Sequence, residues 1–157
     1  MTVLEIGDKA PDFEVLETME DAWKLSDHIG DNNLLVVFFP LAFSPTCHEE
    51  MCAIRDGFGE LANLDAEVVA VSVDSPFVLA KWKEELGLQY PLLSDFNKEA
   101  GRAYSAFHEE LGPLKGVDKR AAFIIDTSGK IAYEWISDDP GVLPDIDEIM
   151  DKLDEMR

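Results

Sequence analysis

The residues of this chain best suited to chemistry are its two cysteines, Cys47 and Cys52, which lie five positions apart. Cys47 follows Ser44 and Pro45, which are typical of a helix N-cap and of a first helical residue. Cys47 would then lie in the first turn of a helix, where free backbone N–H groups and the positive end of the helix dipole stabilise a thiolate. This position predicts a nucleophilic or redox-active thiol.

A strand and a helix are expected to position Cys47. Residues 34–39 are a continuous apolar run closed by Pro40, which is typical of a strand buried on both faces. The following residues place apolar side chains at helical spacing, in the order Cys47, Met51, Ile54, Phe58 and Leu61. Cys47 therefore begins the buried face of the predicted helix. Gly57 and Gly59 weaken this helix and can bend it.

Cys52 lies on a different side of the same predicted helix. Residues five apart on a regular helix are about 140° out of phase, and their Cα atoms are ~8 to 9 Å apart. A disulfide needs Cα atoms within ~7 Å of each other. A bond between Cys47 and Cys52 therefore requires local unwinding of the helix.

The rest of the chain predicts further strands and helices around this unit. Strands are expected at 67–73, 91–93, 120–126 and 131–136, and helices at 76–86, 97–107 and 144–156. Strands that alternate with helices and end in an antiparallel hairpin predict an α/β fold, with a central mixed β-sheet flanked by helices. No repeat or linker divides the sequence, so we expect a single domain over residues 1–157.

Composition and charge argue against several classes of partner. The chain has no apolar run approaching the ~18 residues of a membrane span and no N-terminal secretion signal, so we expect a soluble cytoplasmic protein that binds no membrane. Its 33 acidic and 13 basic residues give a formal net charge of -20, which makes nucleic acid a poor partner. This charge suits a cytoplasm that contains molar salt, where self-repulsion is screened. An acidic face for a basic partner is the alternative interpretation.

Several motifs together resemble the peroxiredoxins, which have a thioredoxin-like fold. The signature of that family is a proline, three residues, Thr or Ser, two residues and a cysteine, and it stands here as Pro40, Ser44 and Cys47. The resemblance continues through residues 6–13, 38–43, 90–95 and 120–126, and so covers almost the whole chain. Segments 40–43 and 91–95 look most like the group of alkyl hydroperoxide reductase E.

The resemblance implies a thiol peroxidase that reduces hydrogen peroxide and organic hydroperoxides through a sulfenic acid on Cys47. Arg120 matches the active-site arginine of the family and would hold the thiolate and the peroxide with its fork of donors. Ser44 would donate its hydroxyl to the peroxide, Pro40 would shield the sulfur from water, and Glu50 would orient the arginine. Plainer interpretations are an N-cap alone for Ser44, a surface ion pair for Arg120 and solvated helix surface for Glu50.

The resemblance also implies which molecules the protein works with. No cofactor is expected, because sulfur carries both electrons and an external thiol restores it. The reductant would be a thioredoxin-like protein or a low-molecular-weight thiol. The chain would form a homodimer or a higher oligomer.

The role of Cys52 stays open between two interpretations. Peroxiredoxins of the bacterioferritin comigratory protein type have a resolving cysteine at this offset, which implies an intramolecular disulfide with Cys47. One-cysteine members lack a cysteine there, and Cys52 would then be a passenger. Two alternative functions lie outside the family. One is a thioredoxin-like dithiol protein, but the cysteines of such proteins are separated by only two residues. The other is a soft metal site formed by Cys47, Cys52 and His48, but an intact helix places these three side chains poorly for binding one metal ion.

Overall fold

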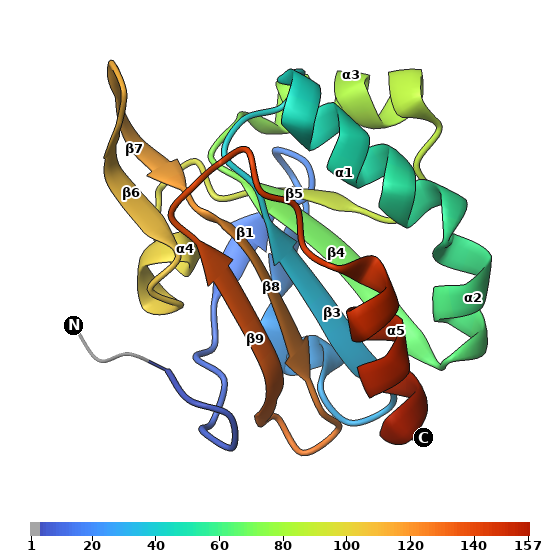
Figure 1. Ribbon diagram of the computed structural model, residues 1–157. Helices are drawn as coiled ribbons and strands as arrows, with labels where there is room; N and C mark the ends of the chain where they lie inside the picture. Colours follow the sequence, from blue (N-terminus) through green and yellow to red (C-terminus); the bar gives the residue numbers. More distant parts are fainter. Residues whose placement is uncertain (1–3) are drawn as a thin grey trace.

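The computed structural model describes residues 4–157, which fold around one large β-sheet (Figure 1). Its seven strands are β1 (Glu14–Leu16), β2 (Ala22–Lys24), β3 (Asn33–Phe38), β4 (Ala66–Ser72), β5 (Leu92–Ser94), β8 (Arg120–Ile125) and β9 (Ile131–Ser137). Two further strands, β6 (Phe107–Leu111) and β7 (Leu114–Asp118), form a separate hairpin, which projects away from the helices in Figure 1.

The sheet is mixed, with β3 near its centre. The strand order is β2-β1-β5-β4-β3-β8-β9. β3 pairs in parallel with β4 and antiparallel with β8, and β8 pairs antiparallel with β9. All six residues of β3 are buried, as expected for a strand covered on both faces. The predicted mixed α/β sheet is confirmed.

One face of the sheet is covered by four helices, α1 (Pro45–Asp56), α2 (Phe58–Asn63), α3 (Pro76–Leu86) and α5 (Ile146–Glu155). Leu35 and Val37 of β3 point to this side and pack with Cys47, Met51 and other apolar residues of the helices. Successive strand residues alternate between faces, so Leu34, Val36 and Phe38 point the other way. Cys47 therefore lies inside the helical side of the core.

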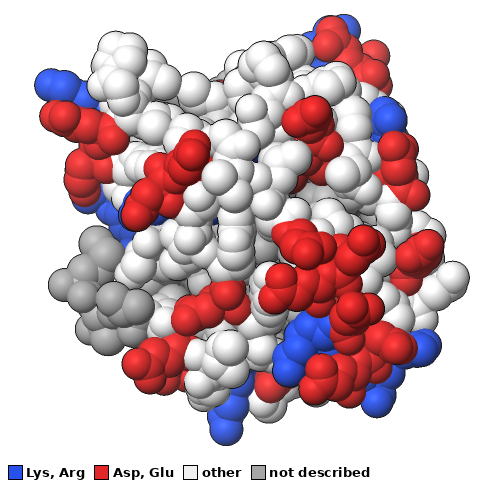
Figure 2. All heavy atoms as spheres, viewed as in Figure 1, with Lys and Arg blue, Asp and Glu red and all other residues white. Residues whose placement is uncertain are grey.

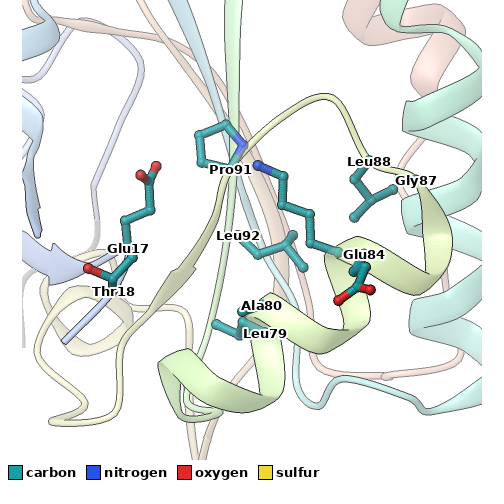
Figure 3. A pocket seen from close by; sticks show the side chains of 10 residues that line it. Glu17, Thr18, Leu79, Ala80, Glu84, Gly87, Leu88, Pro91 and Leu92 are labelled. Atoms are coloured by element: carbon teal, nitrogen blue, oxygen red, sulfur yellow. The ribbon is translucent and has the colours of Figure 1, made fainter.

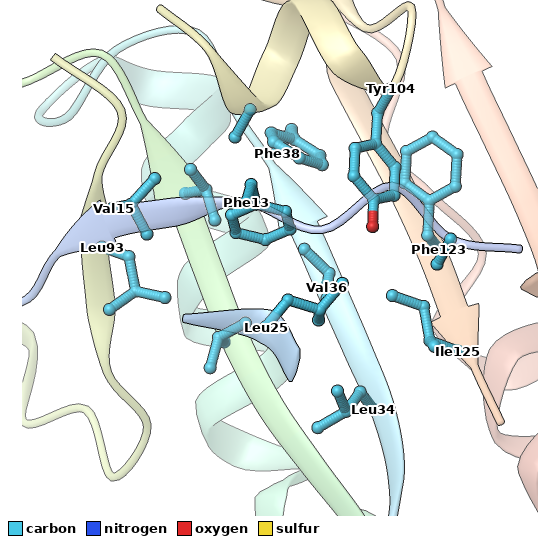
Figure 4. Packing of buried hydrophobic residues seen from close by; sticks show 14 of the residues in the cluster. Phe13, Val15, Leu25, Leu34, Val36, Phe38, Leu93, Tyr104, Phe123 and Ile125 are labelled. Carbon is cyan, nitrogen blue, oxygen red and sulfur yellow. The ribbon is translucent and has the colours of Figure 1, made fainter. Parts of the chain in front are cut away.

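The opposite face is covered by the N-terminal segment, by the short helix η1 (Leu25–His28) and by α4 (Ala100–Ala103). Figure 4 shows Phe13, Tyr104 and Phe123 packed together over the strands. The ring of Tyr104 meets those of Phe13 and Phe123 at centroid distances of 5.5 and 5.0 Å, in edge-to-face arrangements. Tyr104 also donates its hydroxyl to the carbonyl of Pro11, which ties α4 to the N-terminal segment.

Most predicted elements agree with the structure to within a few residues. The helix at 76–86 is confirmed in detail, since Ser75 accepts the N–H of Val78 and Gly87 closes the helix in the left-handed conformation. The hairpin at 120–136 and the closing helix are confirmed as β8, β9 and α5. The helix after Cys47 ends at Asp56, because Gly57 separates α1 from α2. A side chain at Gly57 would come within 2.7 Å of Met150 Cε, so this glycine also lets α5 approach.

The predicted helix at 97–107 is wrong. Only Ala100–Ala103 is helical, and Phe107 already belongs to β6. Lys98 and Ser105 adopt positive φ angles of 61° and 57°, and this left-handed backbone interrupts the helix on both sides. Strands β1, β2, β6 and β7 were not predicted from the sequence.

Acidic side chains are scattered over the surface, and they outnumber basic ones on the face drawn in Figure 2. Several of the basic residues are engaged in exposed ion pairs, for example Lys119 with Asp138 and Arg157 with Asp154. Within residues 4–157, none of the helices combines the length and the apolar character that a membrane span requires.

Candidate active site

Cys47 lies at the start of α1, directly after the loop that follows β3. Ser44 has the extended backbone of an N-cap, Pro45 is the first helical residue, and Cys47 falls in the first turn. The Cys47 side chain is fully buried. The Ser44 hydroxyl makes no capping bond and donates instead to the carbonyl oxygen of Leu41 at 3.0 Å. The side chain of Ser44 therefore leaves the first N–H groups of α1 uncapped, and these groups favour an anion beside them.

Arg120 brings a positive charge to the sulfur. It is the first residue of β8, which lies against β3, and its side chain is 1% exposed. Its Nη2 donates to Cys47 Sγ at 3.1 Å, and its Nη1 donates to Glu50 Oε1 at 2.7 Å. A third donor, Nε, reaches the carbonyl oxygen of Pro140 at 2.9 Å. These three bonds fix the plane of the guanidinium, so that one N–H aims at the thiol.

Glu50 lies one helix turn after Cys47 and is as buried as Arg120. Burial raises the pKa of Glu50 from 4.5 to about 7, although the guanidinium of Arg120 acts in the opposite direction. Glu50 Oε2 has no hydrogen-bond partner among residues 4–157, which agrees with a carboxylate that is costly to ionise. The single cation of Arg120 is therefore shared between two acids. When Glu50 is protonated, the full charge acts on Cys47.

The loop between β3 and α1 holds the remaining predicted site residues. Pro40 is buried, and Phe43 has a positive φ of 69°, a strained conformation for a non-glycine residue. The N–H of Ala42 donates to Asp74 Oδ2 at 2.7 Å, and the same oxygen accepts the Ser72 hydroxyl at 2.7 Å. Asp74 thus anchors the loop to the end of β4.

Cys52 stands apart from this cluster. The α1 helix runs without interruption from Pro45 to Asp56, so the helix places the two cysteines on different sides. Both are free thiols, and Cys52 is partly exposed whereas Cys47 is buried. The Cys52 Sγ contacts His48 Nε2 at 3.6 Å. The structure therefore brings Cys47, Arg120 and Glu50 together, with Ser44 and Pro40 in the adjoining loop, and leaves Cys52 outside.

Three contributors to this site were missed from the sequence: Asp74, Pro140 and Tyr90. Tyr90 is buried in front of β5, and its hydroxyl donates to the carbonyl oxygen of Met51 at 2.8 Å, between the two cysteines. Asp74 had one usable signal, since it follows the strand predicted at 67–73, which a helix connects to the strand before Cys47, and strands joined through a helix are usually parallel. Parallel neighbours end at the same edge of a sheet, so Asp74 could have been expected near the loop.

A cavity of about 440 Å³ lies elsewhere, between the segment after β1 and α3 (Figure 3). Leu79, Leu88 and Leu92 supply apolar side chains to its lining, and Lys83 also lines it. Neither cysteine lines it. Among residues 4–157, no group of three or more Cys, His, Asp or Glu side chains is placed to hold a metal ion.

The sequence and the fold of this chain are similar to those of known proteins. Residues 6–134 match the AhpC/TSA family. The chain belongs to this family. The predictions of a peroxiredoxin and of a peroxidase oxidoreductase are thereby confirmed, since curated relatives are named peroxiredoxins and alkyl hydroperoxide reductases.

The similarity to these peroxiredoxins extends over most of the chain. Alkyl hydroperoxide reductase E of Mycobacterium tuberculosis is 35% identical over 133 residues, which cover 83% of this chain and 84% of that protein. The chloroplastic 2-Cys peroxiredoxin BAS1 of Arabidopsis thaliana is 34% identical over 162 residues, which cover 97% of this chain and 59% of that protein.

Solved structures of peroxiredoxins share the fold. Peroxidoxin BcpB from Mycobacterium tuberculosis has a TM-score of 0.86 and 30% identity, covering 98% of this chain and 99% of that one. A peroxiredoxin-like protein from Aquifex aeolicus has a TM-score of 0.88 and 27% identity, covering 100% of this chain and 90% of that one. The predicted thioredoxin-like fold class is confirmed.

Proposed function

We propose that this thiol peroxidase reduces hydrogen peroxide and organic hydroperoxides with Cys47 as its nucleophile. The observation that carries the proposal is the 3.1 Å bond from Arg120 Nη2 to the buried Cys47 Sγ, with the guanidinium held by Glu50 on its other side. A cation and a helix start at one sulfur stabilise the thiolate, which is the reactive form.

The proposed first step transfers one oxygen atom to sulfur. The Cys47 thiolate attacks one peroxide oxygen and the O–O bond breaks. The second oxygen leaves with the bonding electrons and takes a proton, which gives water or an alcohol and a sulfenic acid on Cys47. The remaining N–H donors of Arg120 and the uncapped N–H groups of α1 are available to the oxygen that gains negative charge.

Ser44 and Pro40 are proposed to shape the entrance. The Ser44 hydroxyl is committed to Leu41 in the absence of substrate, so donation to a peroxide requires that it rotate away from that carbonyl. The Cys47 side chain is fully buried. Peroxide therefore reaches the sulfur only after a neighbouring part of the chain moves, and the adjoining loop from Pro40 to Ser44 is the segment that we propose to move.

The second step is proposed to involve Cys52. Its thiol attacks the Cys47 sulfenic acid, and the products are an intramolecular disulfide and water. Because α1 is continuous, this step needs transient unwinding between the cysteines. A thioredoxin-like protein or a low-molecular-weight thiol would then reduce the disulfide. The homodimer and the single domain stay predictions.

The test is intact mass with thiol counting before and after one equivalent of hydrogen peroxide. Loss of both thiols within a monomer, with no oxygen added, supports both steps. A gain of oxygen on Cys47 with Cys52 still free supports the first step and makes Cys52 a passenger. An unmodified Cys47 alongside consumed peroxide would overturn the proposal.

A further inference from the structure

Cys52 has a partner on its own helix that the peroxidase mechanism above does not use. His48 lies one turn earlier on α1, and its Nε2 is 3.6 Å from Cys52 Sγ. This separation suits a hydrogen bond between a thiol and an unprotonated ring nitrogen, with the imidazole proton on Nδ1. His48 is exposed and Cys52 is partly exposed. A nucleophile and a base within hydrogen-bond reach are the usual elements of an activated thiol.

A cation on the following turn of α1 is close enough to Cys52 for their charges to interact. Arg55 is held in place by bonds from Nη1 to the carbonyl oxygen of Leu86 at 2.8 Å and from Nε to Asp56 at 3.1 Å. The pKa of Arg55 is raised first by its bond to Asp56 and next by the negative charge of an ionised Cys52. Arg55 and a Cys52 thiolate therefore stabilise each other.

Tyr90, which approaches Cys52 from outside α1, places no negative charge beside the Cys52 sulfur. Tyr90 lies before β5, and burial is the main cause that raises its pKa. Its hydroxyl remains protonated and donates to the carbonyl of Met51. The surroundings of Cys52 thus combine a base on one turn of α1, a cation on the next and a neutral phenol from the sheet side.

We propose that His48 is the general base that activates Cys52 for the resolving step. The His48 imidazole takes the thiol proton, and the Cys52 thiolate attacks the sulfur of the Cys47 sulfenic acid. The S–O bond breaks, and the departing hydroxide takes a proton to become water. The sulfur of Cys47 is thereby reduced from a sulfenic acid to a disulfide sulfur, and the sulfur of Cys52 is oxidised from a thiol to a disulfide sulfur. This role of His48 in the resolving step rests on the proposed function of Cys52.

The order of events follows from the helix. The contact between His48 and Cys52 exists only while the intervening turn is intact, whereas the two sulfur atoms can meet only after it unwinds. Proton transfer therefore comes first, and unwinding carries a thiolate to Cys47. At pH 7 only about 3% of an ordinary thiol with pKa ~8.5 is ionised, so the pair can speed the reaction by at most ~30-fold.

The first experiment measures Cys52 alone. In a Cys47→Ser background, the rate of alkylation of Cys52 by iodoacetamide is compared with and without His48→Gln, from pH 6 to pH 9.5. We expect His48→Gln to slow alkylation roughly tenfold at pH 7, and the two rates to converge near pH 9.5, where a thiol ionises unaided. His28→Gln, which removes an imidazole that pairs with Glu67 on another element, should leave the rate unchanged.

The second experiment measures resolution with Cys47 present. After one equivalent of hydrogen peroxide at pH 7, His48→Gln should slow formation of the intramolecular disulfide by a similar factor, while the burst of Cys47 oxidation keeps its rate. Equal alkylation rates at pH 7, a rate difference that persists unchanged at pH 9.5, or an unchanged rate of disulfide formation would each overturn the role of His48. Failure of the wild type to form any disulfide, with Cys52 alkylation still dependent on His48, would instead refute the proposed function of Cys52.

Discussion

Replacement of Glu50 by glutamine tests the electrostatics of the site. In the wild type, the Glu50 carboxyl has a pKa of about 7 in the folded protein and 4.5 as its ordinary value. Between these values the folded state binds more protons than the unfolded state, so stability is present at low pH and is lost as the pH rises towards 7. Glutamine does not titrate, and its amide oxygen can still accept the bond from Arg120.

The size of the effect follows from the two pKa values. From pH 5 to pH 8, the free energy of unfolding of the wild type should fall by about 2.5 kcal/mol more than that of Glu50→Gln. All other titrating groups are common to both proteins and cancel in the difference. Urea unfolding of both proteins at the two pH values, in molar salt, measures it.

The control is Glu49→Gln, which removes an exposed carboxylate next to Glu50 on α1 and should track the wild type at both pH values. An identical pH dependence of the wild type and Glu50→Gln would show that folding does not raise the pKa of Glu50. So would a variant that loses more stability than the wild type with rising pH, because Arg120 would then have outweighed burial at Glu50.

Three further outcomes are expected. Asp118 is fully buried, and its pKa is raised to about 10, first by burial and next by the charge of Asp95. In urea unfolding between pH 6 and 8, the free energy of unfolding of Asp118→Asn should therefore increase relative to the wild type by about 1.4 kcal/mol per pH unit. A difference that stays constant with pH would contradict this. Asp74→Ala should slow Cys47 oxidation about tenfold in stopped-flow measurements, whereas Asp74→Asn, which can still accept the Ala42 N–H, should retain most of the rate; equal rates would exclude an anchoring role. The thermal midpoint should rise from dilute buffer to molar salt because the net charge is -20, and a flat response would argue against a salt-adapted surface.

The sequence was a reliable guide where local signals agreed with each other. The strand before Cys47 is an unbroken apolar run, and the helix at 76–86 has a serine cap at its start and a glycine at its end. The start of α1 was predictable for the same reason, since Ser44 and Pro45 mark it. These elements depend on short stretches of chain, so no distant contact is needed to predict them.

The elements that were not predicted from the sequence depend on tertiary contacts. The segment 97–107 contains good helix formers, but Asp95 accepts the N–H groups of Glu99, Ala100 and Gly101 and so fixes where the short helix begins. The chain then turns at Ser105 into the β6–β7 hairpin. The hydrophobic pattern of that hairpin is weak because most of its side chains are at least partly exposed.

The same distinction applies to the site. The positions of Cys47, Glu50 and Arg120 were expected from the resemblance to peroxiredoxins, and the structure brings these three side chains together. The backbone oxygen of Pro140 that holds Arg120 could not be predicted, because any residue supplies a carbonyl and only the path of the chain after β9 brings this one close.

Whether Cys47 is the nucleophile is decided most directly by the single-turnover rate with hydrogen peroxide, measured in molar salt for Cys47→Ser and Cys52→Ser. We expect Cys52→Ser to consume one equivalent of peroxide at the wild-type rate and to gain one oxygen atom on Cys47, while Cys47→Ser consumes none. Peroxide consumption by Cys47→Ser at the wild-type rate would show that Cys47 is not the nucleophile.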